Sequence, residues 1–205
     1  MKIGDNYNLP DKELLQPGNR RGGLMLWVPT ETMIIIGKGS DPLLELISEN
    51  IDADQIQVIR RGTGGCSVVL SPEMAVVSFV LQNDKGRKNS EYFQLFNSVI
   101  LKALKRLGIE MAVQAGISDI TINDCKIVGS SIYRNKDIVF YHAIINVAGS
   151  TDIMERYLTI PPRYPDYRRG RTHKDFVTSL KAQGYNLDLS RFEDALRAEW
   201  LMHFK

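Results

Sequence analysis

Residues 60–70 read Arg-Arg-Gly-Thr-Gly-Gly-Cys-Ser-Val-Val-Leu, a paired arginine and a glycine-rich turn between two apolar runs. The run before it, residues 56–60, and the run after it both predict β-strands. Closely spaced glycines let the backbone approach a ligand, and successive backbone N–H groups in such a turn can hold an anion. Arg60 and Arg61 add charged donors that suit phosphate or carboxylate. The stretch predicts a strand–turn–strand unit with an anion site; the alternative is a hairpin turn with surface arginines.

The same turn differs from two common phosphate-binding loops. It lacks the Gly-Lys-Ser/Thr ending of a P-loop. The residues after it predict a strand rather than a helix, which disfavours a dinucleotide-binding Rossmann unit.

Short apolar strands alternate with a few helices on both sides of this turn. Residues 90–107 predict the clearest helix, because their apolar side chains recur at three- and four-residue steps. Ser90 suits its N-cap and Gly108 its C′ position. We expect residues 23–28 to form a hairpin with 33–36. Further strands are expected at 75–81, 110–113, 120–122, 126–133 and 138–147, and further helices at 42–48, 151–158 and 189–203. Adjacent strands interrupted by single helices predict the α+β class, with mixed or mainly antiparallel sheets flanked by helices.

The length, charge balance and cysteine count of the chain exclude several classes of protein. The chain has 205 residues, a length typical of one domain, with 26 Lys and Arg against 24 Asp and Glu. This balance excludes nucleic-acid binding by bulk charge and argues against a disordered acidic chain. Two cysteines form neither a disulfide framework nor a four-ligand zinc site. There is no apolar run of about 20 residues and no signal peptide, so we expect a cytoplasmic protein without a membrane partner.

A second motif covers residues 119–131, which read Asp-Ile-Thr-Ile-Asn-Asp-Cys-Lys-Ile-Val-Gly-Ser-Ser. The Asn-Asp pair at 123–124 predicts a hairpin turn. Lys126 then begins a strand that contains small residues, which leave room for a substrate beside its ammonium group. The alternative is an exposed lysine on an edge strand.

The two motifs, in this order and about sixty residues apart, resemble those of the lipoate–protein ligase A family in the biotin and lipoate ligase superfamily. That family carries Arg-Arg-x-Ser/Thr-Gly-Gly-Gly before a strand, and later Asn-Asp, a turn and Lys-x-x-Gly-Ser-Ala. The chain departs from this pattern at three points: Cys66 replaces the third glycine, Ser118 replaces the Asn, and Leu70-Ser71 stands where His-Asp is frequent. The resemblance implies a single catalytic domain of biotin/lipoate-ligase type over residues 1–205. It implies no C-terminal accessory domain, which some members supply as a separate polypeptide.

The resemblance also implies an activity. Members of the family activate lipoate with ATP to lipoyl-AMP and transfer the lipoyl group to a lysine of a lipoyl domain. ATP, Mg²⁺ and lipoate are thus the expected cofactors and substrate, and a lipoyl-domain protein is the expected acceptor, with no nucleic acid and no metal held by the protein alone. Lys126 would be the catalytic residue at the reacting centre. The residues that would bind the substrate or adenylate are Arg61, Thr63, Gly64, Gly65, Cys66, Asp119, Gly129, Ser130 and Ser131.

A basic, aromatic stretch at residues 163–174 is the third feature. Arginine interleaved with tyrosine can bind nucleic acid, but such a stretch is more often a solvated loop or one that orders over a ligand. By position it is similar to a family loop that closes near the adenylate. Arg168, Arg169 and Arg171 would then contact a phosphate or an acidic acceptor.

Other functions stay open at this point. An octanoyl or lipoyl transferase of the same superfamily uses a cysteine thioester without ATP, but neither Cys66 nor Cys125 stands where we expect that nucleophile. A subunit that only transfers the group from lipoyl-AMP, or a protein that binds without turnover, would share the same motifs. His142 is expected to pack or hydrogen-bond rather than to act as a base. The choice between lipoate and octanoate, the carrier and the oligomeric state are left open by the sequence.

Overall fold

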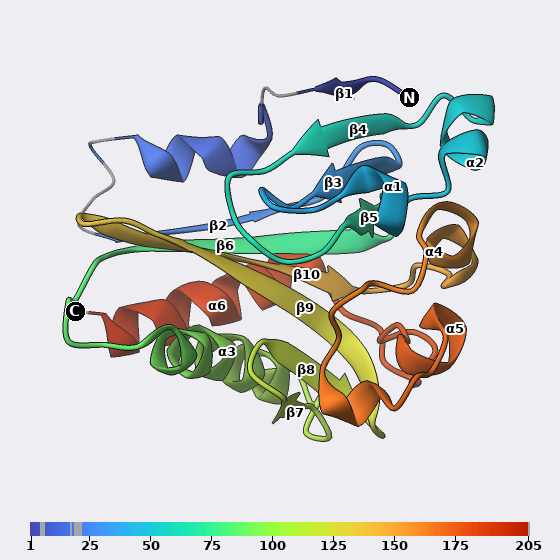
Figure 1. Ribbon diagram of the computed structural model, residues 1–205. Coiled ribbons are helices and arrows are strands. Elements are labelled where there is room, and N and C mark those ends of the chain that lie inside the picture. The colour runs from blue at the N-terminus through green and yellow to red at the C-terminus, as the bar shows by residue number, and fades with distance from the viewer. Residues whose placement is uncertain (5–6, 17, 19–21, 205) are drawn as a thin grey trace.

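Two β-sheets form the frame of the protein (Figure 1). The computed structural model describes residues 1–4, 7–16, 18 and 22–204. The strands are β1 (Ile3–Gly4), β2 (Gly23–Trp27), β3 (Met33–Ile36), β4 (Gln57–Arg60), β5 (Val68–Leu70), β6 (Met74–Gln82), β7 (Val113–Ala115), β8 (Asp119–Ile122), β9 (Cys125–Arg134) and β10 (Ile138–Asn146). The larger, antiparallel sheet has the order β2-β6-β10-β9-β8-β7, and the smaller, mixed sheet the order β1-β4-β3-β5. The predicted α+β class is confirmed.

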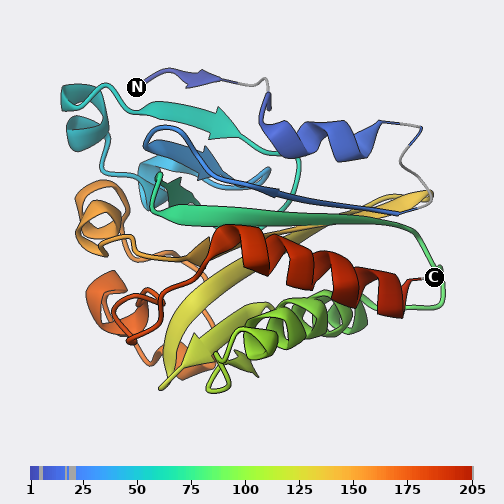
Figure 2. The same cartoon turned by 180° about the vertical axis from the view of Figure 1, so that it is seen from behind.

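Helices flank these sheets. The helices are α1 (Pro42–Glu45), α2 (Ser48–Ala53), α3 (Asn89–Arg106), α4 (Asp152–Tyr157), α5 (His173–Phe176) and α6 (Leu189–His203), with 3-10 turns at Pro10–Leu15 and Asp166–Arg168. The two long helices, α3 and α6, cover one face of the larger sheet, as the view from behind shows (Figure 2). The smaller sheet lies over the opposite face (Figure 1).

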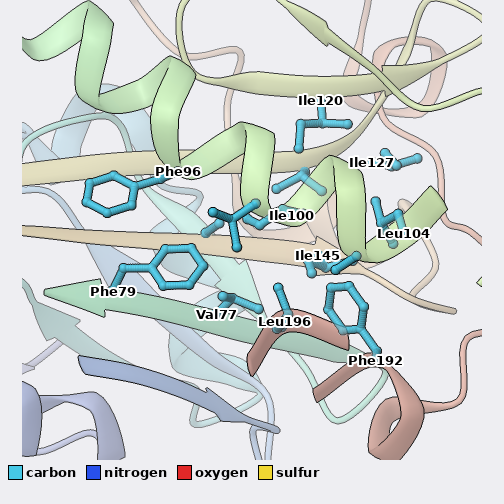
Figure 3. Close-up of a cluster of buried hydrophobic side chains, with 14 of the residues drawn as sticks. Val77, Phe79, Phe96, Ile100, Leu104, Ile120, Ile127, Ile145, Phe192 and Leu196 are labelled. Carbon is cyan, nitrogen blue, oxygen red and sulfur yellow. The ribbon is translucent and has the colours of Figure 1, made fainter. Parts of the chain in front are cut away.

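The main core lies between the larger sheet and its two long helices (Figure 3). Alternate residues of a strand point to opposite faces of its sheet, so Val77 and Phe79 of β6 point toward the helices. Phe79 stacks on Phe96 of α3 with ring centroids 5.3 Å apart, and both rings are fully buried. Residues of the other parity, such as His142 and Ile144 of β10, face the smaller sheet, where they line a cavity.

Four local predictions differ from the structure, and one of them is the helix expected at 42–48, which ends at Glu45. The expected hairpin between 23–28 and 33–36 is wrong: β2 pairs with β6 in the larger sheet, and β3 lies in the smaller sheet between β4 and β5. All four residues of β3 are buried, so this strand suits the middle of a sheet. Helix α3 begins one residue earlier than predicted, with Lys88 rather than Ser90 as N-cap, and the strand expected at 110–113 begins only at Val113.

Other local predictions are confirmed. The turn between β8 and β9 has φ values of 51° at Asn123 and 62° at Asp124, the left-handed region that two-residue hairpins use. Gly108 follows α3 with φ of 82°, as expected for a C′ glycine. Strand β9 lies between β8 and β10, so Lys126 is not on an edge strand and that alternative is excluded.

Candidate active site

A cavity of about 820 Å³ opens on the face of the larger sheet that points away from α3 and α6. Its volume lies in the range of small-molecule sites. Apolar side chains such as Trp27, Ile35 and Ile144 form one part of the wall. The predicted site residues that line it are Arg61, Gly65, Cys66, Asp119, Lys126, Gly129, Ser130, Ser131 and Arg168; those that do not are Thr63, Gly64, Arg169 and Arg171.

Lys126 is held in the cavity wall by an ion pair and a glycine. Its Nζ lies 2.9 Å from Oδ1 of Asp119, whose side chain is almost fully buried. A Cβ at Gly129 would lie 2.6 Å from Cε and 2.7 Å from Nζ of the lysine. The missing side chain of Gly129 therefore leaves room for the lysine itself, where the sequence predicted room for a substrate.

An irregularity in strand pairing puts these groups on one face. Asp119 pairs with Gly129 and Thr121 with Lys126, and the register shifts between Ile120 and Thr121. The shift leaves one extra residue in β9, which is a β-bulge, and bulges redirect side chains next to functional sites. Without it Lys126 and Gly129, three residues apart, would point to opposite faces.

The glycine-rich turn is organised from within by Arg61. This buried guanidinium donates to the carbonyls of Gly64 and Cys66 at 2.8 and 2.9 Å, and to Oγ1 of Thr63 at 2.8 Å. Its Nη1 also donates to the carbonyl of Ile35 in β3. Burial lowers the pKa of Arg61 to about 10, so the group stays charged at neutral pH. That Arg61 and Thr63 also donate to a ligand stays a prediction.

Arg60 does not belong to the anion site that the paired arginines predicted. Its Nη1 donates to the carbonyls of Gly37 and Ser40 and so holds the turn after β3. Among the three glycines of the loop only Gly65 has a positive φ, at 90°. Its carbonyl lies so close to Gly37 that a Cβ there would approach it to 1.9 Å. Two backbone segments are thus packed directly against each other at the edge of the cavity.

A polar network that the sequence did not predict lies beside this turn. Nε2 of His142 is 2.6 Å from Oγ of Ser131 and 2.9 Å from Oγ1 of Thr63. On the other side of the ring, Nδ1 faces Oδ2 of Asp11 at 3.8 Å, and Asp11 also accepts hydrogen bonds from Tyr7 and Ser78. The expectation that His142 hydrogen-bonds is confirmed.

The ionisation of this network follows from its burial. Burial lowers the pKa of His142, although the neighbouring carboxylate opposes this effect. Burial raises the pKa of Asp11, but hydrogen bonding to His142, Ser78 and Tyr7 outweighs it and leaves the pKa below its usual value. The sequence offers no signal for Asp11, because its 3-10 turn, Pro10–Leu15, also contains the charged residues Lys12 and Glu13.

The basic stretch lines one side of the cavity, and the three of its arginines that the sequence predicted as contacts have different surroundings. Arg168 is 3% exposed and lines the cavity, and its Nη2 has no hydrogen-bond partner among the described residues. Arg171 donates to the carbonyls of Tyr167 and Asp124, which ties the stretch to the β8–β9 turn. Arg169 is exposed, in a left-handed conformation.

The two cysteines lack the surroundings of a nucleophile. Cys66 lines the cavity, but burial raises the pKa of its thiol, as does the negative charge of Glu45. A raised pKa reduces the thiolate that would attack. Sγ of Cys125 lies 3.8 Å from the carbonyl of Asp175, and Cys125 does not line the cavity.

The described part of the chain contains neither a metal-binding cluster nor a membrane-spanning helix. Residues 1–4, 7–16, 18 and 22–204 contain no cluster of three His, Cys, Asp or Glu side chains that could hold a metal ion. Within the same part of the chain, no helix is long and apolar enough to cross a membrane.

Solved lipoate–protein ligases share this fold. The structure of Plasmodium falciparum LipL1 in complex with lipoate has a TM-score of 0.77 at 25% identity, over 98% of this chain and 61% of that one. A bipartite lipoate protein ligase from Thermoplasma acidophilum, described with its E2 lipoyl domain, has a TM-score of 0.76 at 20% identity, over 89% and 71% of the two chains. A lipoate–protein ligase A bound with ATP has a TM-score of 0.74 at 19% identity, over 89% and 72%.

The sequence relationship is more specific than the fold. Residues 11–201 match the lipoyl protein ligase A/B catalytic domain, so the chain belongs to this family. Lipoate–protein ligase 1 of Plasmodium falciparum is 33% identical over 165 residues, which are 80% of this chain and 36% of that protein. The chain thus spans about a third of the length of that relative. The family expected from the two motifs is confirmed.

Proposed function

We propose that this chain is the catalytic domain of a lipoate–protein ligase, which activates lipoate with ATP and passes the lipoyl group to a lysine of a lipoyl domain. The observation that carries the proposal is the ammonium group of Lys126, held by Asp119 across Gly129 in the wall of a cavity. Relatives named as lipoate–protein ligases, and a neighbour in complex with lipoate, support the choice of substrate.

Lys126 is the residue that would act on the reacting atoms. Activation joins the carboxylate of lipoate to the α-phosphate of ATP and releases pyrophosphate, and negative charge develops on the carbonyl and phosphate oxygens. A fixed cation in a water-poor cavity stabilises such charge, and one such donor is worth roughly 10²–10³ in rate. The acyl phosphate is reactive toward water. Residues 161–171, which overlap the basic stretch and line the cavity, form the segment that would cover and protect it.

The rest of the wall supplies binding. Gly65 and Cys66 would pack against the acyl-adenylate, and the apolar wall around Ile144 and Trp27 would take the aliphatic tail. Arg168 supports phosphate binding, because it lines the cavity and its buried Nη2 lacks a partner among the described residues. Arg171 and Arg169 would act at most on the acceptor.

The residues of the cavity would hold Mg²⁺ only together with the phosphate groups of ATP. Mg²⁺ in nucleotide sites uses one or two carboxylates together with phosphate oxygens and keeps several waters. Asp119 is the carboxylate at the cavity wall that the resemblance assigns to substrate or adenylate binding. Because both of its oxygens are engaged by Lys126 and Tyr167, we assign the metal to the ATP phosphates.

The acceptor and any accessory partner belong to the same proposal. A lipoyl-domain protein is the expected acceptor. The bipartite ligase among the structural neighbours supports a separate accessory polypeptide as a second partner. A chain that needs this partner would catalyse transfer from lipoyl-AMP but not the first step.

The test is intact-mass detection of acylation on a lipoyl domain, with lipoate, Mg²⁺ and the purified chain, with and without ATP. We expect a lipoyl mass shift that requires ATP. The rate of acylation should be about 10²–10³-fold lower in Lys126→Ala. Lys136→Ala is the matched control, because Lys136 is exposed in the turn between β9 and β10 and does not line the cavity.

Other outcomes separate the alternatives. Activity without nucleotide that is lost in Cys66→Ser would show a thioester transferase instead. Activity only from synthetic lipoyl-AMP would show a partner-dependent subunit, and no acylation from either source would contradict the proposal.

A further inference from the structure

The buried carboxylate of Asp119 is bound from two sides by different parts of the chain. Its Oδ1 lies 2.9 Å from Nζ of Lys126, and its Oδ2 accepts a 2.7 Å hydrogen bond from the hydroxyl of Tyr167. Tyr167 belongs to the 161–171 segment that covers the cavity, whereas Lys126 belongs to the larger sheet. A single carboxylate, 3% exposed, therefore connects the cover of the cavity to its lysine.

Tyr167 is held in this position by packing as well as by its hydroxyl. Its ring lies 5.1 Å from that of Phe176, and a Cβ at Gly116 would lie 3.4 Å from the ring edge. Arg171 donates to its carbonyl at 2.9 Å. Burial raises the pKa of Tyr167, and the charge of Asp119 raises it further. The hydroxyl therefore stays protonated and acts as a donor at neutral pH.

A bound oxygen fixes the plane of a carboxylate. The terminal torsion of an aspartate is broad, so a carboxylate with one free oxygen can turn and carry its ion-pair partner with it. With Tyr167 on Oδ2, the lysine pairs with Oδ1, which also accepts a 3.2 Å hydrogen bond from Oγ of Ser118. A displacement of about 1 Å at a reacting centre can cost roughly 10²-fold in rate.

We propose that Tyr167 is a positioning residue that aligns Lys126 through Asp119 once the 161–171 segment lies over the cavity. This inference rests on the proposed function of Lys126. It adds that covering the cavity and aligning Lys126 are coupled, because both occur in the same closed arrangement that excludes water. Such coupling protects a reactive acyl phosphate, because the centre is complete only when the cavity is covered.

The first test is Tyr167→Phe, which removes the hydroxyl and keeps the ring and its packing. We expect kcat for acylation to fall about ten- to hundredfold, since a hydrogen bond to a buried charged group is lost. The KM values for lipoate and ATP should stay within about twofold, because the interaction does not contact the substrates. Tyr185→Phe is the control, since Tyr185 packs beside the main core and does not line the cavity.

A double-mutant cycle separates positioning from general support of the segment. If Tyr167 acts through Asp119, then Tyr167→Phe causes no further loss in an Asp119→Asn background. Additive losses, or an unchanged kcat in Tyr167→Phe, would overturn the inference.

A second readout does not depend on turnover. The rate at which an amine-acylating reagent labels Lys126, followed by peptide mass spectrometry, should rise severalfold in Tyr167→Phe because the ammonium group and its cover are released. If the unaltered chain shows no turnover, the proposed function fails and this labelling alone decides: an unchanged rate refutes the link between Tyr167 and Lys126.

Discussion

Replacing Gly129 with alanine tests the site without altering any group that carries out chemistry. The added Cβ would lie 2.6 Å from Cε and 2.7 Å from Nζ of Lys126. Unbonded carbon atoms prefer separations of about 3.5–4.0 Å, so the end of the lysine must move by about 1 Å. That movement breaks the 2.9 Å contact with Asp119. We expect the acylation rate to fall roughly 10²-fold or more, close to the loss in Lys126→Ala.

The fold should tolerate the same change. The atoms in the way are the far end of a flexible side chain that is 28% exposed, so the lysine can turn toward solvent. A cost of about 1 kcal/mol lowers the melting temperature of a chain of this size by about 2–4 °C. The assay is the rate of lipoyl transfer to a lipoyl domain beside a thermal melt, with Gly39→Ala as control because nothing lies within 4 Å of a Cβ there. A Gly129→Ala variant that keeps most of its activity would refute the assignment of Lys126.

Two further predictions concern buried charge. Arg168→Met keeps volume over Phe176 but removes the unpartnered Nη2, together with the hydrogen bond from Nε to the carbonyl of Arg171. We expect the KM for ATP to rise about tenfold or more, measured by steady-state kinetics, with a melting temperature that is lowered but shows a folded protein. An unchanged KM would contradict a phosphate contact. Burial lowers the pKa of both His142 and His173, so the unfolded chain takes up protons first as pH falls below about 6.5. The free energy of unfolding should therefore decrease from pH 7 toward pH 5. Urea unfolding between pH 7 and pH 5 measures this decrease, and His173→Gln should reduce the dependence of the free energy of unfolding on pH. A free energy of unfolding that does not change with pH would contradict the prediction.

The sequence predicted the parts of the site that depend on local patterns. Strand–turn–strand periodicity located the glycine-rich turn, and the Asn-Asp pair located the β8–β9 hairpin, whose left-handed φ values follow from those residue types. Lys126 and its small neighbours were identified from the second motif. The apolar steps of residues 90–107 predicted α3 to within one residue at each end.

Pairings between distant segments were not predictable in the same way. The edge strand β2 pairs with β6 rather than with β3, because the completely apolar β3 needs a neighbouring strand on each side. No local sequence pattern predicts which strands those neighbours are. The network of Asp11 with His142 joins residues more than a hundred positions apart. The hydrogen bonds that Arg60 and Arg61 make inside the turns also depend on carbonyls from other segments.

Hydrophobic periodicity was enough to give the fold class, and the resemblance of two short motifs gave the family and singled out Lys126 as the candidate catalytic residue. Tertiary structure decided how that lysine is held. A register shift in β9 turns Lys126 and Gly129 to one face, and the covering segment supplies the hydroxyl of Tyr167 to Asp119. Both effects come from contacts between segments that chain folding brings together, and the strength of such contacts depends on burial and distance, which the order of residues alone does not contain.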